Sequence, residues 1–201
     1  MGGDVLRWSE YRSMPWKNGG GTTREVAAGV VVQGPLAPAE PEDGFDWRVS
    51  VADVDAGGPF SSFPGIDRVI TLVEGEGMVL TVDGTPHSVG PLSPFAFSGD
   101  ATTDCRLEAG AVRDMNVMTR RGRATARVRI VAVTAARGTE MACAAGETLL
   151  VMAVTEGIAV GGPDEQGRAL GRLDCVPYEG PGALTLRGDG TVAEIRITAA
   201  R

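Results

Sequence analysis

The residue types that this chain lacks limit its chemistry. It has one histidine, His87, and only three cysteines, which are widely spaced among 201 residues. A metal site built from several imidazoles cannot be assembled from one histidine. An odd and scattered cysteine set predicts neither a disulfide framework nor a zinc cluster, and reduced thiols are typical of a cytoplasmic protein. We therefore expect a cytoplasmic chain with no metal and no other cofactor.

Other signals are missing too. No apolar run is long enough for a membrane span, and residues 1–14 lack the charged-then-apolar pattern of a signal peptide. The net charge of −7 argues against general attraction to nucleic acid or to an anionic membrane. There is no serine elbow, no phosphate-binding loop and no cysteine with an evident histidine partner. The residues alone thus assign no catalytic group.

Short apolar runs are what the chain does contain. Runs rich in Val, Ile, Leu and Thr, bounded by Gly, Pro and Asp, predict β-strands, and no long segment keeps the helical period of 3.6. The Asp83-Gly84 pair predicts a hairpin turn because both residue types tolerate a positive φ. The fold class is therefore all-β. The clearest strands are predicted at residues 47–52, 68–74, 78–82, 127–134, 148–154 and 194–198.

An internal repeat predicts the architecture. An apolar strand runs into a Glu-Gly turn twice, at residues 74–75 and 156–157. In each half the chain then returns through an aromatic residue, Phe97 or Tyr178, close to a glycine. This order of hairpins suits a small jelly-roll barrel. We expect two tandem jelly-roll, cupin-like barrels, which together form a bicupin.

The two barrels are expected to divide near residue 125. The N-terminal barrel, 1–125, would carry the ligand pocket, and the C-terminal barrel would cover 126–201. Residues 106–129 contain seven arginines and are expected to carry the connection between the halves. A solvated connector is the first interpretation, and a contact surface for RNA or an acidic partner is the alternative. Pairing through exposed strand edges leaves a homodimer open.

The segment 14–25 (MPWKNGGGTTRE) carries the strongest functional signal. Its three consecutive glycines cost conformational entropy, but they allow close backbone approach with amides that face an anion. Lys17 is the only lysine in the chain, and its compact ammonium is not copied by arginine. Trp16 offers an amphipathic wall, and Asn18 offers both a donor and an acceptor. The alternative is a flexible loop followed by an edge strand.

Alternation along three strands adds further candidates. Thr23 and Glu25 would share one strand face, with Arg24 on the other. In residues 46–53, Arg48 and Ser50 share a face opposite Trp47, which fits either a barrel mouth or a polar solvent face. In residues 113–118, Asp114, Asn116 and Met118 share a face, where Asn116 is a ligand contact or a core polar group. Arg68, at a strand start, serves the pocket or pairs with Asp67.

Four segments resemble the signature of a known family. PWKNGGGTTREVA, FDWRVSVADV, GPFSSFPGIDRVITLVEGEGM and RDMNVMTRRG resemble, in order and spacing, segments of the HutD/Ves family. They cover residues 5–125, and the second half is similar only in its general strand pattern. The resemblance implies a bacterial, metal-free bicupin with its pocket in the N-terminal cupin. Some members are linked to histidine utilisation, with a role in sensing or buffering an N-formylated or imidazole-containing carboxylate.

Carried onto this sequence, the resemblance and the glycine loop give one set of ligand-binding residues. The set is Trp16, Lys17, Asn18, Gly19, Gly20, Thr23, Arg24, Glu25, Trp47, Arg48, Ser50 and Asn116.

Two functions are predicted. The first is a regulator or sensor that binds a small anionic metabolite, with Lys17 and Arg48 neutralising its carboxylate. The alternative is a metal-free isomerase or hydrolase acting on a small acid. In that reading Glu25 would be the base, and Lys17 would stabilise an enolate or oxyanion.

Overall fold

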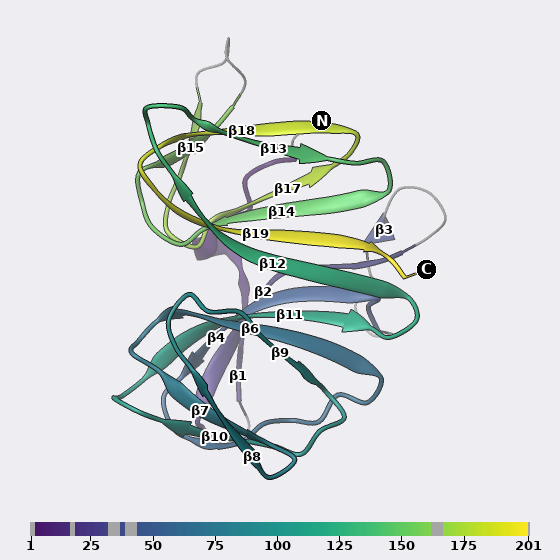
Figure 1. Ribbon diagram of the computed structural model, residues 1–201, viewed down its shortest axis with the longest axis vertical. Coiled ribbons are helices and arrows are strands. Elements are labelled where there is room, and N and C mark those ends of the chain that lie inside the picture. Colours follow the sequence, from purple (N-terminus) through teal and green to yellow (C-terminus); the bar gives the residue numbers. More distant parts are fainter. Residues whose placement is uncertain (1–2, 17–18, 32–36, 39–43, 162–166, 201) are drawn as a thin grey trace.

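The protein is all-β in the part of the chain that its structure, a computed structural model, describes: residues 3–16, 19–31, 37–38, 44–161 and 167–200. The single helical element there is a 3-10 turn, η1 (Trp8–Glu10). Within the same residues no helix is long and apolar enough to cross a membrane. Figure 1 shows two halves, one above the other, each built of antiparallel strands.

The first half contains two sheets. The larger has the strand order β1-β2-β4-β11-β6-β9, with β3 paired to β2, and the smaller has the order β5-β10-β7-β8. Their strands are β1 (Arg12–Pro15), β2 (Gly21–Val30), β3 (Ala37–Pro38), β4 (Trp47–Val54), β5 (Gly58–Pro59), β6 (Ile66–Glu74), β7 (Met78–Val82), β8 (Thr85–Val89), β9 (Phe95–Ser98), β10 (Thr103–Leu107) and β11 (Val112–Arg120).

The second half repeats this topology. Its sheets have the orders β12-β19-β14-β17 and β13-β18-β15-β16, which match β4-β11-β6-β9 and β5-β10-β7-β8 strand for strand. The repeat predicted from the sequence is therefore a repeat of strand order. The strands are β12 (Ala124–Val133), β13 (Thr139–Cys143), β14 (Glu147–Ala153), β15 (Ile158–Val160), β16 (Arg168–Leu170), β17 (Cys175–Glu179), β18 (Gly182–Gly188) and β19 (Gly190–Ala199).

The predicted strands and turns are confirmed. All six strand runs fall on β4, β6, β7, β12, β14 and β19. Asp83 and Gly84 both have positive φ, 47° and 82°, and join β7 to β8. His87 lies on β8, an edge strand, and its ring contacts Phe95 at 5.0 Å between centroids. The three cysteines are buried free thiols.

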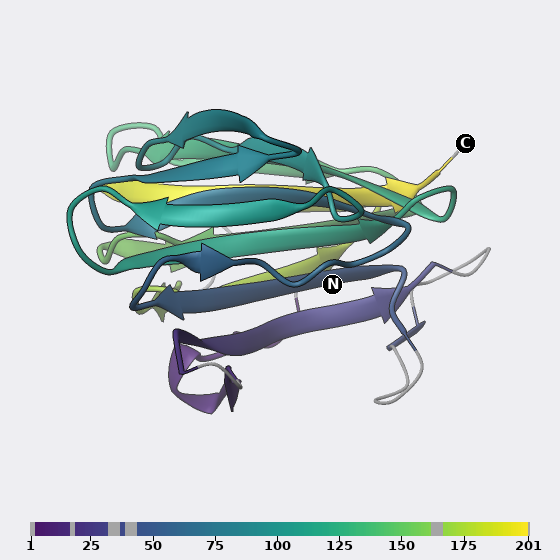
Figure 2. The same ribbon diagram turned by 90° about the horizontal axis from the view of Figure 1, so that it is seen from below.

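Three apolar cores hold the four sheets together as stacked layers (Figures 1 and 2). One core lies inside each half. The third joins the halves, where Trp47, Val49 and Met115 of the first meet Leu150 and Ile195 of the second. Each fully buried side chain of this kind contributes roughly 1.5–3 kcal/mol. Because the central sheets bury both faces, their strands present one face to the other half and one to their own interior.

The N-terminal segment ties the two halves together. Leu6 bridges to Cys175, and the Gly3 amide donates to the Pro177 carbonyl oxygen at 3.0 Å. Arg7 forms an ion pair with Asp174 at 2.7 Å. From there η1 leads back to β1 on the first sheet. Residues 3–7 therefore pack on the second half, before the chain enters the first.

The arginine-rich segment 106–129 carries the connection between the two halves, as predicted, through an exposed turn at residues 121–123. Most of it forms β11 and the start of β12, and only a short turn joins the halves. Arg121 pairs with Asp67 at 2.7 Å and Asp100 at 2.9 Å, and Arg123 pairs with Asp46 at 3.0 Å. Carboxylates of the chain itself thus neutralise the basic turn. The role of this segment in partner binding stays a prediction.

Substitution by alanine should destabilise the protein to different extents at Gly75, in the first Glu-Gly turn, and at Gly84, in the hairpin between β7 and β8. Gly75 has φ of 94°, and a Cβ there would lie 2.8 Å from a Val112 methyl carbon. Gly84 has a similar φ of 82° but meets nothing within 4 Å. Both alanine variants carry left-handed strain of about 1–2 kcal/mol. We expect Gly75→Ala to cost clearly more than Gly84→Ala in urea unfolding. Equal costs would mean that the contact with β11 is absent.

Candidate functional site

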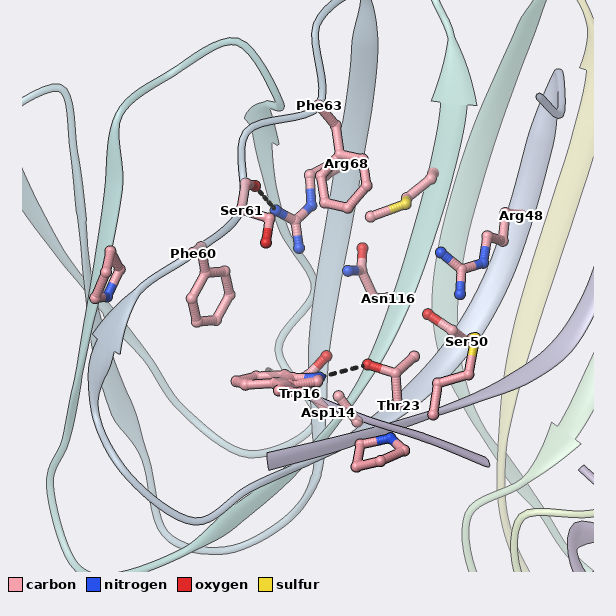
Figure 3. A pocket seen from close by; sticks show the side chains of 15 residues that line it. Trp16, Thr23, Arg48, Ser50, Phe60, Ser61, Phe63, Arg68, Asp114 and Asn116 are labelled. Atoms are coloured by element: carbon pink, nitrogen blue, oxygen red, sulfur yellow. Dashed lines mark hydrogen bonds between the residues drawn. The ribbon is translucent and has the colours of Figure 1, made fainter. Parts of the chain in front are cut away.

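A cavity of about 640 Å³ lies inside the first half. The larger sheet forms its floor and one side, and the segment after β5 forms the other side (Figure 3). Its lining combines polar, sulfur-containing and aromatic side chains. The lining residues are Met14, Pro15, Trp16, Thr23, Arg48, Ser50, Ala52, Pro59, Phe60, Ser61, Phe63, Arg68, Asp114, Asn116 and Met118.

Strand alternation decides which side chains reach the cavity. On β4, Arg48 and Ser50 line it, while Trp47 and Val49 point into the core between the halves. On β11, Asn116 lines it, and its neighbours on either side belong to that same core. Successive strand residues face opposite sides of a sheet, so both orientations follow from the sequence.

Three buried polar side chains form the floor. Arg68 on β6 is 5% exposed, Asp114 on β11 is 2% exposed and Asn116 is 8% exposed. The Arg68 Nε, the Asp114 Oδ1 and the Asn116 Oδ1 have no hydrogen-bond partner among the described residues. Buried polar groups are nearly always paired, and each unpaired one costs about 1–3 kcal/mol. A floor with three such atoms is suited to a ligand that satisfies them.

Arg68 is held among aromatic rings. Its guanidinium carbon lies 4.8 Å from the ring centroid of Phe97, 5.2 Å from that of Phe63 and 5.5 Å from that of Phe60. A single long hydrogen bond, 3.5 Å, joins its Nη1 to the carbonyl oxygen of Ser61 (Figure 3). Cation–π contacts orient the group without using its fork of N–H donors. The guanidinium can therefore donate to a carboxylate.

Burial shifts the ionisation of two floor groups. It raises the pKa of Asp114 to about 7, because the nearby Arg68 charge only partly offsets the loss of water. Burial also lowers the pKa of Arg68 to about 10, opposed by Asp114 and reinforced by Arg48. Arg68 therefore stays charged at neutral pH, while Asp114 is close to its midpoint.

The walls bring Trp16 and Arg48 to the cavity. The Trp16 indole N–H donates to the Thr23 hydroxyl oxygen at 2.8 Å, and its ring contacts Phe60 edge-on. The Arg48 Nε donates to a Glu25 carboxylate oxygen at 2.7 Å. The Glu25 carboxylate is thus occupied by Arg48, and Glu25 does not line the cavity. Glu25 is therefore poorly placed to act as the base of the alternative enzyme reading.

The structure brings together five of the residues named from the sequence: Trp16, Thr23, Arg48, Ser50 and Asn116.

Two other predicted ligand contacts lie elsewhere. Arg24 is on the opposite face of β2, where it forms an ion pair with Asp53 and stacks on Trp8. Trp47 is buried in the core between the halves. In each case the side chain alternates away from the cavity, so neither residue lines it.

The glycine loop differs from the anion cradle that we expected. The Gly19 amide donates to the Trp16 carbonyl oxygen at 3.0 Å. The Gly20 carbonyl oxygen accepts from the Asp55 amide. Neither glycine lines the cavity. Lys17 and Asn18 lie outside the described residues, so their anchoring of an anion stays a prediction.

Sequence reasoning left Arg68 undecided and gave Asp114 no role. The signal for both was present. Asp114 shares the strand alternation of Asn116, and Arg68 follows the aromatic pair Phe60 and Phe63 in the sequence. Strand alternation does not predict that β6 pairs with β11. This pairing places Arg68 opposite Met118.

In the second half, Glu194 of β19 stands at the strand position that corresponds to Asn116 of β11. Asn116 pairs with residues of β4 and β6, and Glu194 pairs with the matching positions of β12 and β14. Glu194 accepts from Arg196 at 2.7 Å and lies 3.5 Å from Arg129, and Arg196 also donates to Glu147 at 2.8 Å. The buried Glu194 is thus paired with arginines of its own chain, whereas the Asn116 Oδ1 has no partner among the described residues.

A metal site was not expected from the sequence. In the described ranges, no three His, Cys, Asp or Glu side chains lie close enough together to hold a metal ion. The absence of a resident metal or cofactor stays a prediction.

These features define an all-β, cupin-like protein whose first half contains a cavity with a buried polar floor. Solved structures at 7% and 9% identity share the fold with TM-scores of 0.70 and 0.67, a likeness that shows the fold alone. A family model described as HutD matches residues 8–194. The chain belongs to the HutD family.

Two relatives and one solved structure support this membership. An uncharacterized 21.2 kDa protein in the hutC 3′ region of Pseudomonas putida is 37% identical over 88% of this chain and 86% of its own length. Protein Ves of Citrobacter koseri is 39% identical over 62% of this chain and 63% of its own length. HutD from Pseudomonas fluorescens SBW25, solved in a formate condition, is 38% identical, covers 98% of this chain and 99% of its own, and has a TM-score of 0.79.

Proposed function

We propose that the protein binds a small carboxylate in the cavity of its first half. The observation that carries the proposal is the floor, where Arg68, Asp114 and Asn116 are buried with unpartnered polar atoms beside a cavity of about 640 Å³. Arg68 supplies the charge, and its fork of donors matches a carboxylate. Arg48 and Ser50 supply further polar contacts at the wall.

The cavity has the size and the mixed lining of a small-molecule site. Trp16, Phe60 and Phe63 form an apolar wall beside the polar floor (Figure 3). A ligand with a carboxylate at one end and a small flat or apolar body therefore fits it. The formate condition in which the Pseudomonas fluorescens HutD was solved makes formate the smallest probe to try.

The same proposal includes the architecture and the biological role. The two halves, 1–125 and 126–201, would be the two barrels of a bicupin, which their shared strand order supports. A role as regulator or sensor in histidine utilisation is supported by the hutC-region relative and by the HutD family. A cytoplasmic location, a homodimer and the absence of nucleic-acid and membrane partners stay predictions.

A thermal-shift screen tests the proposal. Wild-type protein is heated with formate, glutamate, urocanate or N-formylglutamate, each over a range of concentrations. Ligand at 100 times its dissociation constant stabilises the folded state by about 2.7 kcal/mol, which raises the unfolding midpoint. We expect a saturable rise with at least one acid. The proposal fails if none of the acids raises the midpoint at any concentration.

Substitution of Asn116 distinguishes the two roles predicted for it, a ligand contact and a core polar group. Asn116→Leu replaces a buried amide, whose Oδ1 is unpartnered among the described residues, by an apolar side chain of similar size. We expect the variant to unfold at equal or higher urea concentration, because an unsatisfied buried group is removed. We also expect its carboxylate affinity to fall about tenfold, from the loss of one hydrogen bond. A less stable variant with full affinity would make Asn116 structural.

A further inference from the structure

Asp114, if its carboxyl is ionised, would oppose the binding of an anion in this cavity. Its carboxyl is buried in the cavity floor, and no hydrogen bond to it is found among the described residues. Arg68 is the cation that acts on it most strongly. An ionised Asp114 would offset the positive charge that attracts a ligand. It would also repel the ligand's carboxylate in a region of low effective dielectric.

The groups around Asp114 leave it as the one that changes charge near neutral pH. From β6 it faces Arg68, whose pKa of about 10 keeps it charged. From β4, Arg48 lies on the same side and is paired with Glu25 of β2.

Asp53 and Cys105 complete the surroundings of Asp114. Although burial opposes it, hydrogen bonds from Arg24 and Arg113 lower the pKa of Asp53, which stays ionised on the far face of β4. On β10, burial raises the pKa of the Cys105 thiol to about 11, so this thiol stays neutral. The cavity residues of β1, β5 and the segment after it (Met14, Pro15, Trp16, Pro59, Phe60, Ser61 and Phe63) have no ionisable group that titrates near neutral pH.

We propose that the carboxylate enters the cavity together with one proton, which Asp114 holds. This inference rests on the proposed carboxylate site and adds its regulation by pH. In the bound state the neutral Asp114 donates its O–H to the ligand, and Arg68 gives its full charge to the ligand's carboxylate. The balance is one ligand anion and one proton taken up by the ionised form of the free protein.

Proton uptake gives the binding a defined pH dependence. At a pH below the midpoint of Asp114 the free protein already carries the proton, and the affinity is constant. Above it, each pH unit lowers the apparent affinity tenfold, because the proton must be drawn from solution. The midpoint lies near pH 7, so the change falls in the physiological range.

The experiment uses sodium formate as probe, because formate stays ionised from pH 5.5 to pH 9. Apparent dissociation constants are measured by thermal shift across this range for wild type, Asp114→Asn and Asp104→Asn. Asp104 is an exposed carboxylate on β10, so its variant is the matched control for the same chemical change. Calorimetry of the wild type at pH 8, in two buffers with different ionisation enthalpies, counts the protons directly.

We expect the dissociation constant of wild type and of Asp104→Asn to rise about tenfold per pH unit above pH 7, and that of Asp114→Asn to stay flat. Calorimetry should give close to one proton taken up per formate. Wild-type binding that is independent of pH, without proton uptake, overturns this inference and leaves the carboxylate site standing. An absence of saturable formate binding at every pH overturns both. If Asp114→Asn does not fold, the number of protons counted by calorimetry on the wild type still tests this inference.

Discussion

Replacement of Arg68 by methionine is expected to move the carboxylate-dependent thermal shift to much higher ligand concentrations while leaving the protein folded. Arg68 is the buried cation of the cavity floor, and a charge-assisted hydrogen bond contributes about 1.5–3 kcal/mol. The loss corresponds to a roughly 10- to 150-fold weaker dissociation constant. Methionine suits the aromatic surroundings of Phe60, Phe63 and Phe97 because sulfur packs well against ring edges. Titration of the variant with the tightest-binding acid of the screen provides the measurement.

An arginine outside the cavity provides the control. Arg106 on β10 is exposed, and Arg106→Met makes the same chemical change there. Its affinity for the acid should equal that of wild type. If Arg68→Met retained wild-type affinity with an unchanged unfolding midpoint, Arg68 would not be the anchor, and the carboxylate would have to bind elsewhere.

Asp114→Asn is expected to stabilise the folded protein at pH 8 and to have little effect at pH 4. An ordinary aspartate ionises near pH 3.9, whereas burial raises the pKa of Asp114 to about 7. Between these values the folded state holds a proton that the unfolded state has released. The wild type therefore loses stability as the pH rises from about 4 to 7, and no further above that. Asparagine cannot ionise, so the variant avoids this loss.

The expected gain at pH 8 is on the order of 4 kcal/mol, since the pKa is raised by about three units and one pKa unit corresponds to about 1.4 kcal/mol. Urea unfolding of both proteins at pH 4, 6 and 8 measures the difference as a function of pH. The exposed Asp104→Asn again serves as control and should show no such trend. A gain that is the same at all three pH values would mean that Asp114 ionises normally, and the cause would then be packing.

Local sequence pattern determined most of the strand structure. The hairpin at Asp83-Gly84 follows from the backbone freedom of two adjacent residues. The separation of Arg48 and Ser50 from Trp47 follows from strand alternation, a property of the chain itself. The recurring Glu-Gly turns identified the repeat, which the matching strand orders of the two halves bear out. All these features depend on residues close together in the sequence.

Motif resemblance was less reliable for individual contacts. Arg24 and Trp47 stand in signature segments, yet both alternate away from the cavity. Alternation places Arg24 on the strand face opposite Thr23 and Trp47 on the face opposite Ser50, which takes both side chains away from the cavity. A signature segment contains residues that hold the two halves together as well as residues that line the site.

Tertiary structure alone decided the floor of the cavity. Arg68 and Asp114 are far apart in the sequence, and they share a cavity because the sheet places β6 beside β11. Their altered ionisation comes from burial, which depends on how the sheets pack. In the second half the same strand order brings Glu194 into an ion pair with Arg196 instead. The sequence by itself thus determined the strands and their faces, since these are local. The packing of distant strands decided which polar side chains are buried together in the cavity floor.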